Sequence, residues 1–101
     1  MKVLVIDDNA LHLKMCRILL QSLGHDVETI DSLGKLKGEI GKIEIPEIVL
    51  IDSSQGAGLT GIDVLGFIKD QQIFAEVKTI ALAADAREKS MFERAGCDIV
   101  G

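Results

Sequence analysis

The hydrophobic positions of the chain fall into short β-branched runs that are separated by longer stretches with helical spacing. Aliphatic runs at residues 2–6, 48–51 and 78–83 are typical of strands that are covered on both faces. Residues 26–30 alternate weakly, which indicates a strand near the sheet edge, and residues 97–101 begin a fifth strand. Strands alternating with helices at this spacing predict an α/β fold with a doubly wound parallel sheet.

The stretches between these strands begin and end with residues that are typical of helix termini. The spacing of apolar residues predicts helices over residues 10–23, 32–43, 61–70 and 85–95. Asn9 is a favourable N-cap for the first helix, and Asp85 with Glu88 resembles a capping box before the last. Gly24 and Gly96 follow two of the helices and supply the left-handed conformation that ends them.

Two helices differ in how firmly the pattern specifies them. The first carries five large apolar residues on one face, which we expect to pack into the core: Leu11, Met15, Ile18, Leu19 and Leu23. The second, over residues 32–43, contains Gly34, Gly38 and Gly41. Because each glycine costs about 1 kcal/mol relative to alanine in a helix, we expect this helix to be the least stable.

Composition narrows the class of protein. A chain of 101 residues with 48% hydrophobic and 27% charged residues is typical of one ordinary globular domain. The net charge of −5 and only three aromatic residues argue against direct nucleic-acid binding. Cys16 and Cys97 lack metal-ligand spacing and are expected to be reduced thiols. We find no signal peptide and no membrane-spanning run, and so expect a cytoplasmic protein without a membrane partner.

Carboxylates end two of the expected strands. Asp7 and Asp8 follow the first strand, and Asp52 ends the strand that begins at residue 48. If these strands are neighbours, their carboxyl ends meet at one edge of the sheet, where ligands bind in open α/β folds. The carboxylates then repel and raise one another's pKa unless a cation such as Mg²⁺ neutralises them. The plainer alternative is that Asp7 and Asp8 only favour a helix N-terminus.

Several motifs together resemble the receiver domains of two-component response regulators. They are VIDDN at residues 5–9, VLID at 49–52, GIDVL at 61–65, IALAA at 80–84 and AGCD at 95–98, in order along the whole chain. The separation of Asp7 and Asp52 is also the one that the family shows. The resemblance implies a flavodoxin-like fold with strand order 2-1-3-4-5.

The resemblance also assigns roles to residues. It implies that Asp52 is the phosphoacceptor, phosphorylated by a histidine kinase or phosphotransfer protein in a reaction that depends on Mg²⁺. Asp8 matches the direct metal ligand and Asp7 the ligand that acts mainly through water, while Asp52 and the backbone carbonyl of Ser54 complete the metal site. The implied partner is a downstream output protein or domain, and the domain itself is not expected to be an enzyme.

Three departures from the family pattern leave an alternative open. Ala83 stands where the family has the Thr or Ser that hydrogen-bonds the phosphoryl group, and the family's phosphate-binding Lys would lie beyond Gly101. The loop over residues 53–60 also lacks the family's Pro and is one residue longer. The alternative function is therefore a degenerate receiver, an interaction module that works without phosphorylation.

The chain also ends earlier than the resemblance leads us to expect. Residues 1–101 correspond to a single receiver-like domain that lacks the end of the fifth strand and the last helix, the fifth. We expect this to expose apolar surface beside the first helix. Either the natural protein continues past Gly101, or a homodimer or an exchanged element covers this surface.

Other functions fit the sequence less well. A Mg²⁺-dependent aspartyl-phosphate phosphatase needs a general acid two residues after the nucleophile, where this chain has Ser54. An FMN carrier on the same fold needs aromatic residues in its loops. His12 and His25 are expected to be exposed and distant from the carboxylates, so neither is assigned a phosphodonor role.

Overall fold

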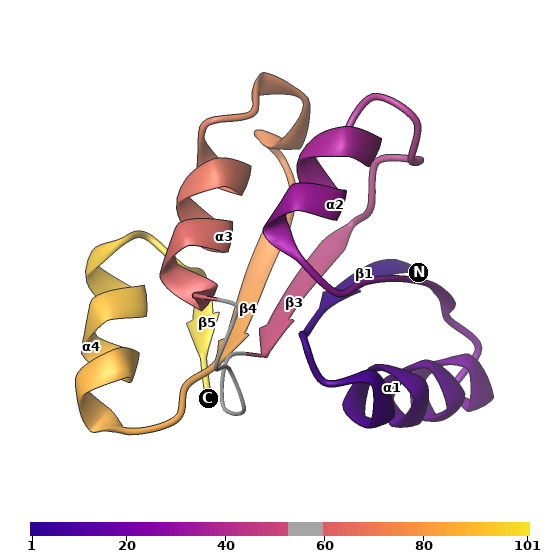
Figure 1. The fold of residues 1–101 in the computed structure, drawn as a ribbon, viewed down its shortest axis with the longest axis horizontal. Coiled ribbons are helices and arrows are strands. Elements are labelled where there is room, and N and C mark those ends of the chain that lie inside the picture. Colours follow the sequence, from indigo (N-terminus) through magenta and orange to yellow (C-terminus); the bar gives the residue numbers. More distant parts are fainter. Residues whose placement is uncertain (53–59) are drawn as a thin grey trace.

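The computed structural model describes residues 1–52 and 60–101, which form a parallel sheet with helices on both faces. In the described residues the sheet has the order β2-β1-β3-β4-β5 (Figure 1). Its strands are β1 (Lys2–Ile6), β2 (Asp26–Ile30), β3 (Ile48–Asp52), β4 (Lys78–Leu82) and β5 (Ile99–Val100). The connections contain α1 (Ala10–Ser22), α2 (Leu33–Glu39), α3 (Gly61–Lys69), the short 3-10 helix η1 (Gln72–Phe74) and α4 (Ala86–Arg94). The predicted doubly wound α/β fold with flavodoxin-like strand order is confirmed.

The predicted N-caps and glycine stops are confirmed. The Asn9 side chain accepts a hydrogen bond of 3.0 Å from the backbone N–H of His12, and Asp85 caps α4 in the same way at 2.8 Å. Gly24 and Gly96 both have φ of +91°. The prediction was too long for α2, which ends at Glu39 rather than at residue 43. The glycines in this segment favour an early end, since each lowers helix stability.

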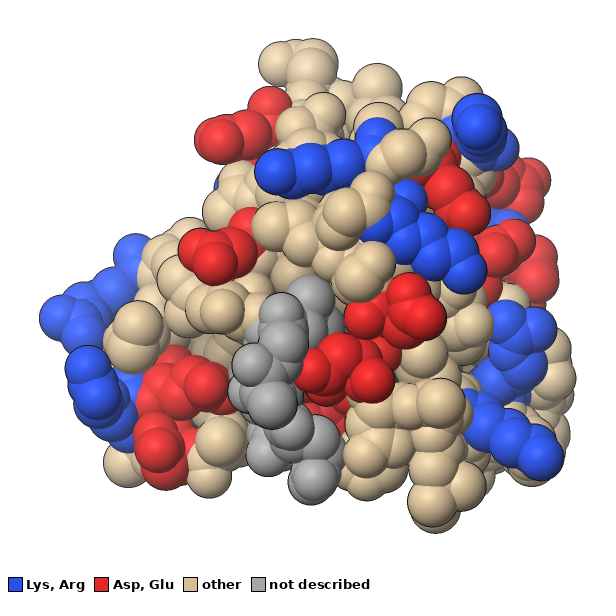
Figure 2. All heavy atoms as spheres, viewed as in Figure 1, with Lys and Arg blue, Asp and Glu red and all other residues tan. Residues whose placement is uncertain are grey.

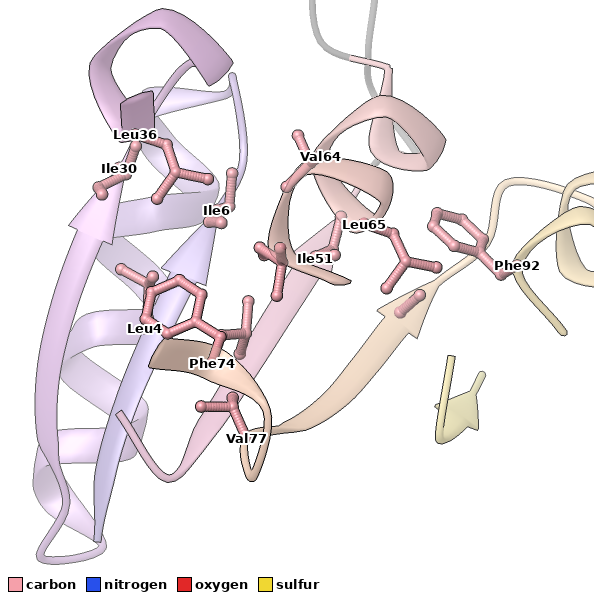
Figure 3. Close-up of a cluster of buried hydrophobic side chains, with 13 residues drawn as sticks. Leu4, Ile6, Ile30, Leu36, Ile51, Val64, Leu65, Phe74, Val77 and Phe92 are labelled. Atoms are coloured by element: carbon pink, nitrogen blue, oxygen red, sulfur yellow. The ribbon is translucent and has the colours of Figure 1, made fainter. Parts of the chain in front are cut away.

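The main hydrophobic core lies between the sheet and the helices α2, α3 and α4 (Figure 3). Alternate residues of β1 and β3 point into it, as a period of two requires. The helices contribute Leu36 from α2, Leu65 from α3 and Phe92 from α4, all with no exposed surface. This core fixes the central strands, and with them the carboxyl ends that carry Asp7 and Asp52.

The opposite face of the sheet is covered by α1, which packs over β1 and β2 (Figure 1). Here Val3, Val5 and Val27 form a second cluster, against which Leu13, Cys16 and Leu20 of α1 pack. The prediction for this helix was wrong: the five apolar residues expected in the core are 59–65% exposed, namely Leu11, Met15, Ile18, Leu19 and Leu23. Both sides of α1 are apolar, so helical spacing alone did not show which side faces the sheet. These exposed residues form an apolar surface on α1 itself.

A hydrogen-bonded pair joins β4 to the residue that precedes the edge strand β5. The Asp98 carboxylate accepts hydrogen bonds from the backbone N–H of Thr79, at 2.8 Å, and from its hydroxyl, at 2.9 Å. The Thr79 hydroxyl accepts one in return from the backbone N–H of Asp98, at 3.1 Å. These bonds, led by that of the Thr79 N–H, lower the pKa of Asp98. They satisfy a Thr79 that is only 1% exposed.

None of the helices in the described part of the chain has the length and apolar character needed to cross a membrane. Cys16 and Cys97 are both free thiols, as expected.

Candidate functional site

The register of the central strands brings two carboxylates together. β1 and β3 are hydrogen-bonded neighbours in which Ile6 pairs with Ile51, so Asp7 and Asp52 follow side by side at the same sheet edge. Both are buried, with 0% and 7% of their surface exposed. Figure 2 shows a group of exposed acidic side chains in the middle of the face that it draws. The predicted convergence of Asp7 and Asp52 is confirmed.

Asp7 is held in one orientation by the start of α1. Its Oδ1 atom accepts a hydrogen bond of 2.9 Å from the backbone N–H of Asn9. Its Oδ2 atom is buried and makes no hydrogen bond with the described residues. Burial raises the pKa of Asp7 and the negative charge of Asp52 raises it further, while the Asn9 bond and His12 oppose the shift. A buried carboxylate oxygen without a hydrogen-bond partner is available to bind a cation.

His12 belongs to this site, contrary to the sequence-based expectation. Its Nδ1 atom lies 3.3 Å from Asp7 Oδ2 and 3.6 Å from Asp52 Oδ2, and its side chain is 34% exposed. The Asn9 cap places His12 in the first turn of α1, where side chains point back toward the helix N-terminus. The cap was visible in the sequence, but it fixes only the helical phase and not the angle at which α1 leaves β1. His25 was also expected to be exposed, but its Nδ1 atom is buried.

The remaining predicted site residues are placed differently. Asp8 is half-buried directly after Asp7. In the described residues it lies outside the group of Asp7, His12 and Asp52, whose ligand atoms are all within 4.8 Å of one another. Ser54, whose carbonyl is the other predicted ligand, is outside the described residues and stays a prediction. Ala83 is half-buried against the main core and offers only a methyl group.

A groove opens beside the carboxylates along α1. It has a volume of about 440 Å³ and is lined by His12, Met15, Cys16, Leu19 and Asp52. Burial raises the pKa of the Cys16 thiol, and the charges of Asp52 and Asp7 add to the effect. We call the neighbouring carboxylates of Asp52, which lines the groove, and of Asp7 the acidic floor; the rest of the lining is mostly apolar. This arrangement suits a small cationic ligand at the floor.

The donor set fits a hard divalent cation. Mg²⁺ binds through one or two carboxylates, keeps several waters and leaves room for a phosphate oxygen. Asp7 and Asp52 supply two adjacent carboxylates, and Asp7 Oδ2 makes no hydrogen bond with any described group. These residues are thus chemically suited to the magnesium ion that the sequence predicted.

Comparison with known proteins gives a consistent picture. The chain is 26% identical over 99 residues to the polar-differentiation response regulator DivK of Brucella ovis, covering 95% of this chain and 78% of that protein. It superposes on a response regulator receiver domain protein from Clostridium thermocellum with a TM-score of 0.80 and 26% identity, covering 98% and 79% of the two chains.

A third protein shares the fold. It is a response regulator from Burkholderia pseudomallei with a phosphorylated aspartic acid, a calcium ion and citrate; its TM-score is 0.81 with 18% identity, over 98% of this chain and 57% of that one. No family model matches the chain. The chain nevertheless has the fold of response-regulator receiver domains and is related to them in sequence.

Proposed function

We propose that the chain is a phosphoacceptor receiver of a two-component system, phosphorylated on Asp52 by a histidine kinase or phosphotransfer protein. Asp7, Asp8 and Asp52 would hold the Mg²⁺ ion. The observation that carries the proposal is the pairing of Asp7 with Asp52, both buried, at the carboxyl end of two central parallel strands. The response regulators to which the chain is similar support it.

The proposed reaction is an in-line phosphoryl transfer. An Asp52 carboxylate oxygen attacks the phosphorus atom, the bond between phosphorus and the donor's leaving atom breaks, and that atom keeps the electron pair. Mg²⁺, when bound, offsets the negative charge of the carboxylates and of the phosphoryl oxygens. Asp7, held by the Asn9 N–H, keeps the acidic floor in place during the transfer. The phosphorylated aspartate and calcium ion of the Burkholderia protein are consistent with this chemistry.

Ala83 makes this receiver a weak stabiliser of the phosphoryl group. A hydrogen bond to a charged group contributes roughly 1.5–3 kcal/mol, and the methyl group of Ala83 cannot donate one. We therefore expect an aspartyl-phosphate that forms but is short-lived, with little rearrangement of the side of the molecule that carries α4. An output protein or domain would then distinguish the two states poorly.

The proposal is tested by intact mass spectrometry after incubation with Mg²⁺ and acetyl phosphate. We expect a labile adduct with the mass of one phosphoryl group in the wild type and none in Asp52→Ala. Asp70→Asn is the matched control, because this exposed carboxylate lies at the far end of α3 and should leave the adduct intact. Failure of the wild type to form the adduct, with its fold intact, would contradict the proposal.

Ala83 also supports a second function, that of a degenerate receiver. If no adduct forms, the degenerate receiver, which binds its partner without phosphorylation, is the better description. The homodimer, the exchanged element and the cytoplasmic location all stay predictions. Size-exclusion chromatography with light scattering tests the first two.

A further inference from the structure

The imidazole of His12 turns the acidic floor of the groove into a mixed nitrogen and oxygen cluster. Nδ1 of His12 lies 3.3 Å from Asp7 Oδ2 and 3.6 Å from Asp52 Oδ2. Neither contact satisfies the buried Asp7 Oδ2 atom, which has no hydrogen-bond partner among the described residues. An unsatisfied buried oxygen that faces a ring nitrogen and a second carboxylate is the arrangement expected of three ligands around one ion.

We propose that His12, Asp7 and Asp52 form a three-ligand site for a first-row transition-metal ion of the Zn²⁺ and Co²⁺ class. The proposal deepens the function proposed above, since it shares Asp7 and Asp52 with the magnesium site and adds His12 as a ligand. The ion would compete with Mg²⁺ for the same floor. Its fourth position would stay open to water or to a phosphoryl oxygen, as in zinc sites with three protein ligands.

The distances between donor atoms favour this class of ion. With metal–ligand bonds of about 2.0–2.1 Å, the edges of a tetrahedron are about 3.3–3.4 Å long. The two distances from Nδ1, 3.3 and 3.6 Å, are close to that edge. The ligand atoms of the three residues all lie within 4.8 Å of one another, so side-chain rotations can bring them around one ion.

The chemistry of the donors favours it too. Mg²⁺ takes oxygen ligands and gains little from an imidazole nitrogen. Zn²⁺ and its neighbours bind imidazole well, and their affinity for mixed nitrogen and oxygen sites exceeds that of the harder ions. His12 therefore shifts the preference of the site toward transition metals without removing either carboxylate.

Asn9 orients two of the three ligands. Its backbone N–H holds Asp7 Oδ1, so that Oδ2 points to the cluster, and its side chain holds the backbone N–H of His12. Such secondary contacts orient the ligands of metal sites and increase affinity. The Asp7 carboxylate and the backbone that carries His12 are thus held in place before any ion arrives.

The test is a Co²⁺ titration of the 101-residue chain in the absence of phosphodonor, followed by visible absorption. We expect one equivalent of Co²⁺ with the intense absorption of a four-coordinate site, displaced by one equivalent of Zn²⁺. In His12→Gln the Co²⁺ affinity should fall at least about tenfold, because loss of a ligand costs at least as much as loss of an outer-shell partner. The Mg²⁺ affinity should change less than twofold.

Two controls separate His12 from two other residues that could bind Co²⁺. His25→Gln removes the other histidine, and Cys16→Ser removes the thiol that lines the same groove. Both variants should keep the Co²⁺ spectrum, and circular dichroism verifies that each is folded. No Co²⁺ binding, a weak six-coordinate spectrum, or equal affinity in wild type and His12→Gln would each overturn the proposal. Loss of the spectrum in Cys16→Ser would overturn the assignment as well.

The same proteins keep this inference distinct from the proposed function. Phosphorylation by acetyl phosphate in Mg²⁺ alone does not require Co²⁺ binding. An adduct at Asp52 without Co²⁺ binding refutes the transition-metal site and leaves the receiver function standing. Co²⁺ binding without a phosphoryl adduct at Asp52 supports the transition-metal site and contradicts the proposed phosphoacceptor function.

Discussion

We expect Asp98 to contribute more to stability than most surface carboxylates. The substitution Asp98→Ala tests this. The substitution removes the acceptor of two hydrogen bonds, at 2.8 and 2.9 Å, and leaves the N–H and hydroxyl of a 1% exposed Thr79 without it. Hydrogen bonds to charged groups contribute roughly 1.5–3 kcal/mol each, and an unsatisfied buried donor costs a similar amount.

The net loss is smaller than the sum of these contributions. Asp98 itself is exposed, so water screens the carboxylate and can reach part of the vacated space. We expect the free energy of unfolding to fall by about 2 kcal/mol, which lowers the melting temperature of a domain of this size by roughly 10 °C. Urea denaturation followed by circular dichroism measures the first quantity, and calorimetry the second.

The pH dependence provides an independent check. Because its pKa is lower in the folded state, the Asp98 carboxylate stabilises the fold above the unfolded pKa, and that contribution is lost as the pH falls through the folded pKa. Wild type and Asp98→Ala should therefore differ at pH 7 and converge in strong acid. Asp98→Asn keeps an oxygen acceptor and should lose less than Asp98→Ala. A loss below about 0.5 kcal/mol, the ordinary range for surface positions, or a difference that does not change with pH, would refute the reasoning.

Four further substitutions test other features. Asp7→Asn should raise the melting temperature at pH 7 in chelator, because the raised pKa of Asp7 makes its ionised form destabilising, and the gain should shrink as the pH falls through that pKa. Phe92→Ala, which removes a side chain with 0% exposure, should cost about 3–5 kcal/mol in urea denaturation; an equal loss in Met91→Ala, which is 36% exposed, would contradict this. Gly96→Ala should cost about 1–2 kcal/mol by calorimetry, since φ is +91° there. Gly34→Ala, with open space in α2, should instead stabilise by about 0.5–1 kcal/mol, and a loss there would show that α2 is limited by packing.

The sequence was sufficient for the sheet and for the pair of carboxylates. β-branched runs that end in Asp7 and Asp52 specify central parallel strands, and the carboxyl ends of such strands share one edge. It was insufficient for α1, where Leu13 and Leu20 face the sheet while an equally apolar side is exposed. When both sides of a helix are apolar, periodicity does not show which side packs against the sheet.

His12 shows a different limit. Its nearness to Asp7 depends on the angle at which the chain leaves β1 and enters α1, a property of tertiary packing that residue types do not encode. The bond between Asp98 and Thr79 likewise depends on how the chain arrives at the sheet edge, although both residues were visible in the sequence. Local signals located the elements, whereas the contacts between elements required the structure.

Asn9 couples the order of the first turn of α1 to the order of the acidic floor. One residue both caps α1 and holds Asp7, so fraying of the first turn of the helix and loosening of the acidic floor are the same fluctuation. Any ligand that favours the ordered floor must suppress that fraying. By reciprocity, any partner that rigidifies the start of α1 must tighten binding at the floor by the same free energy.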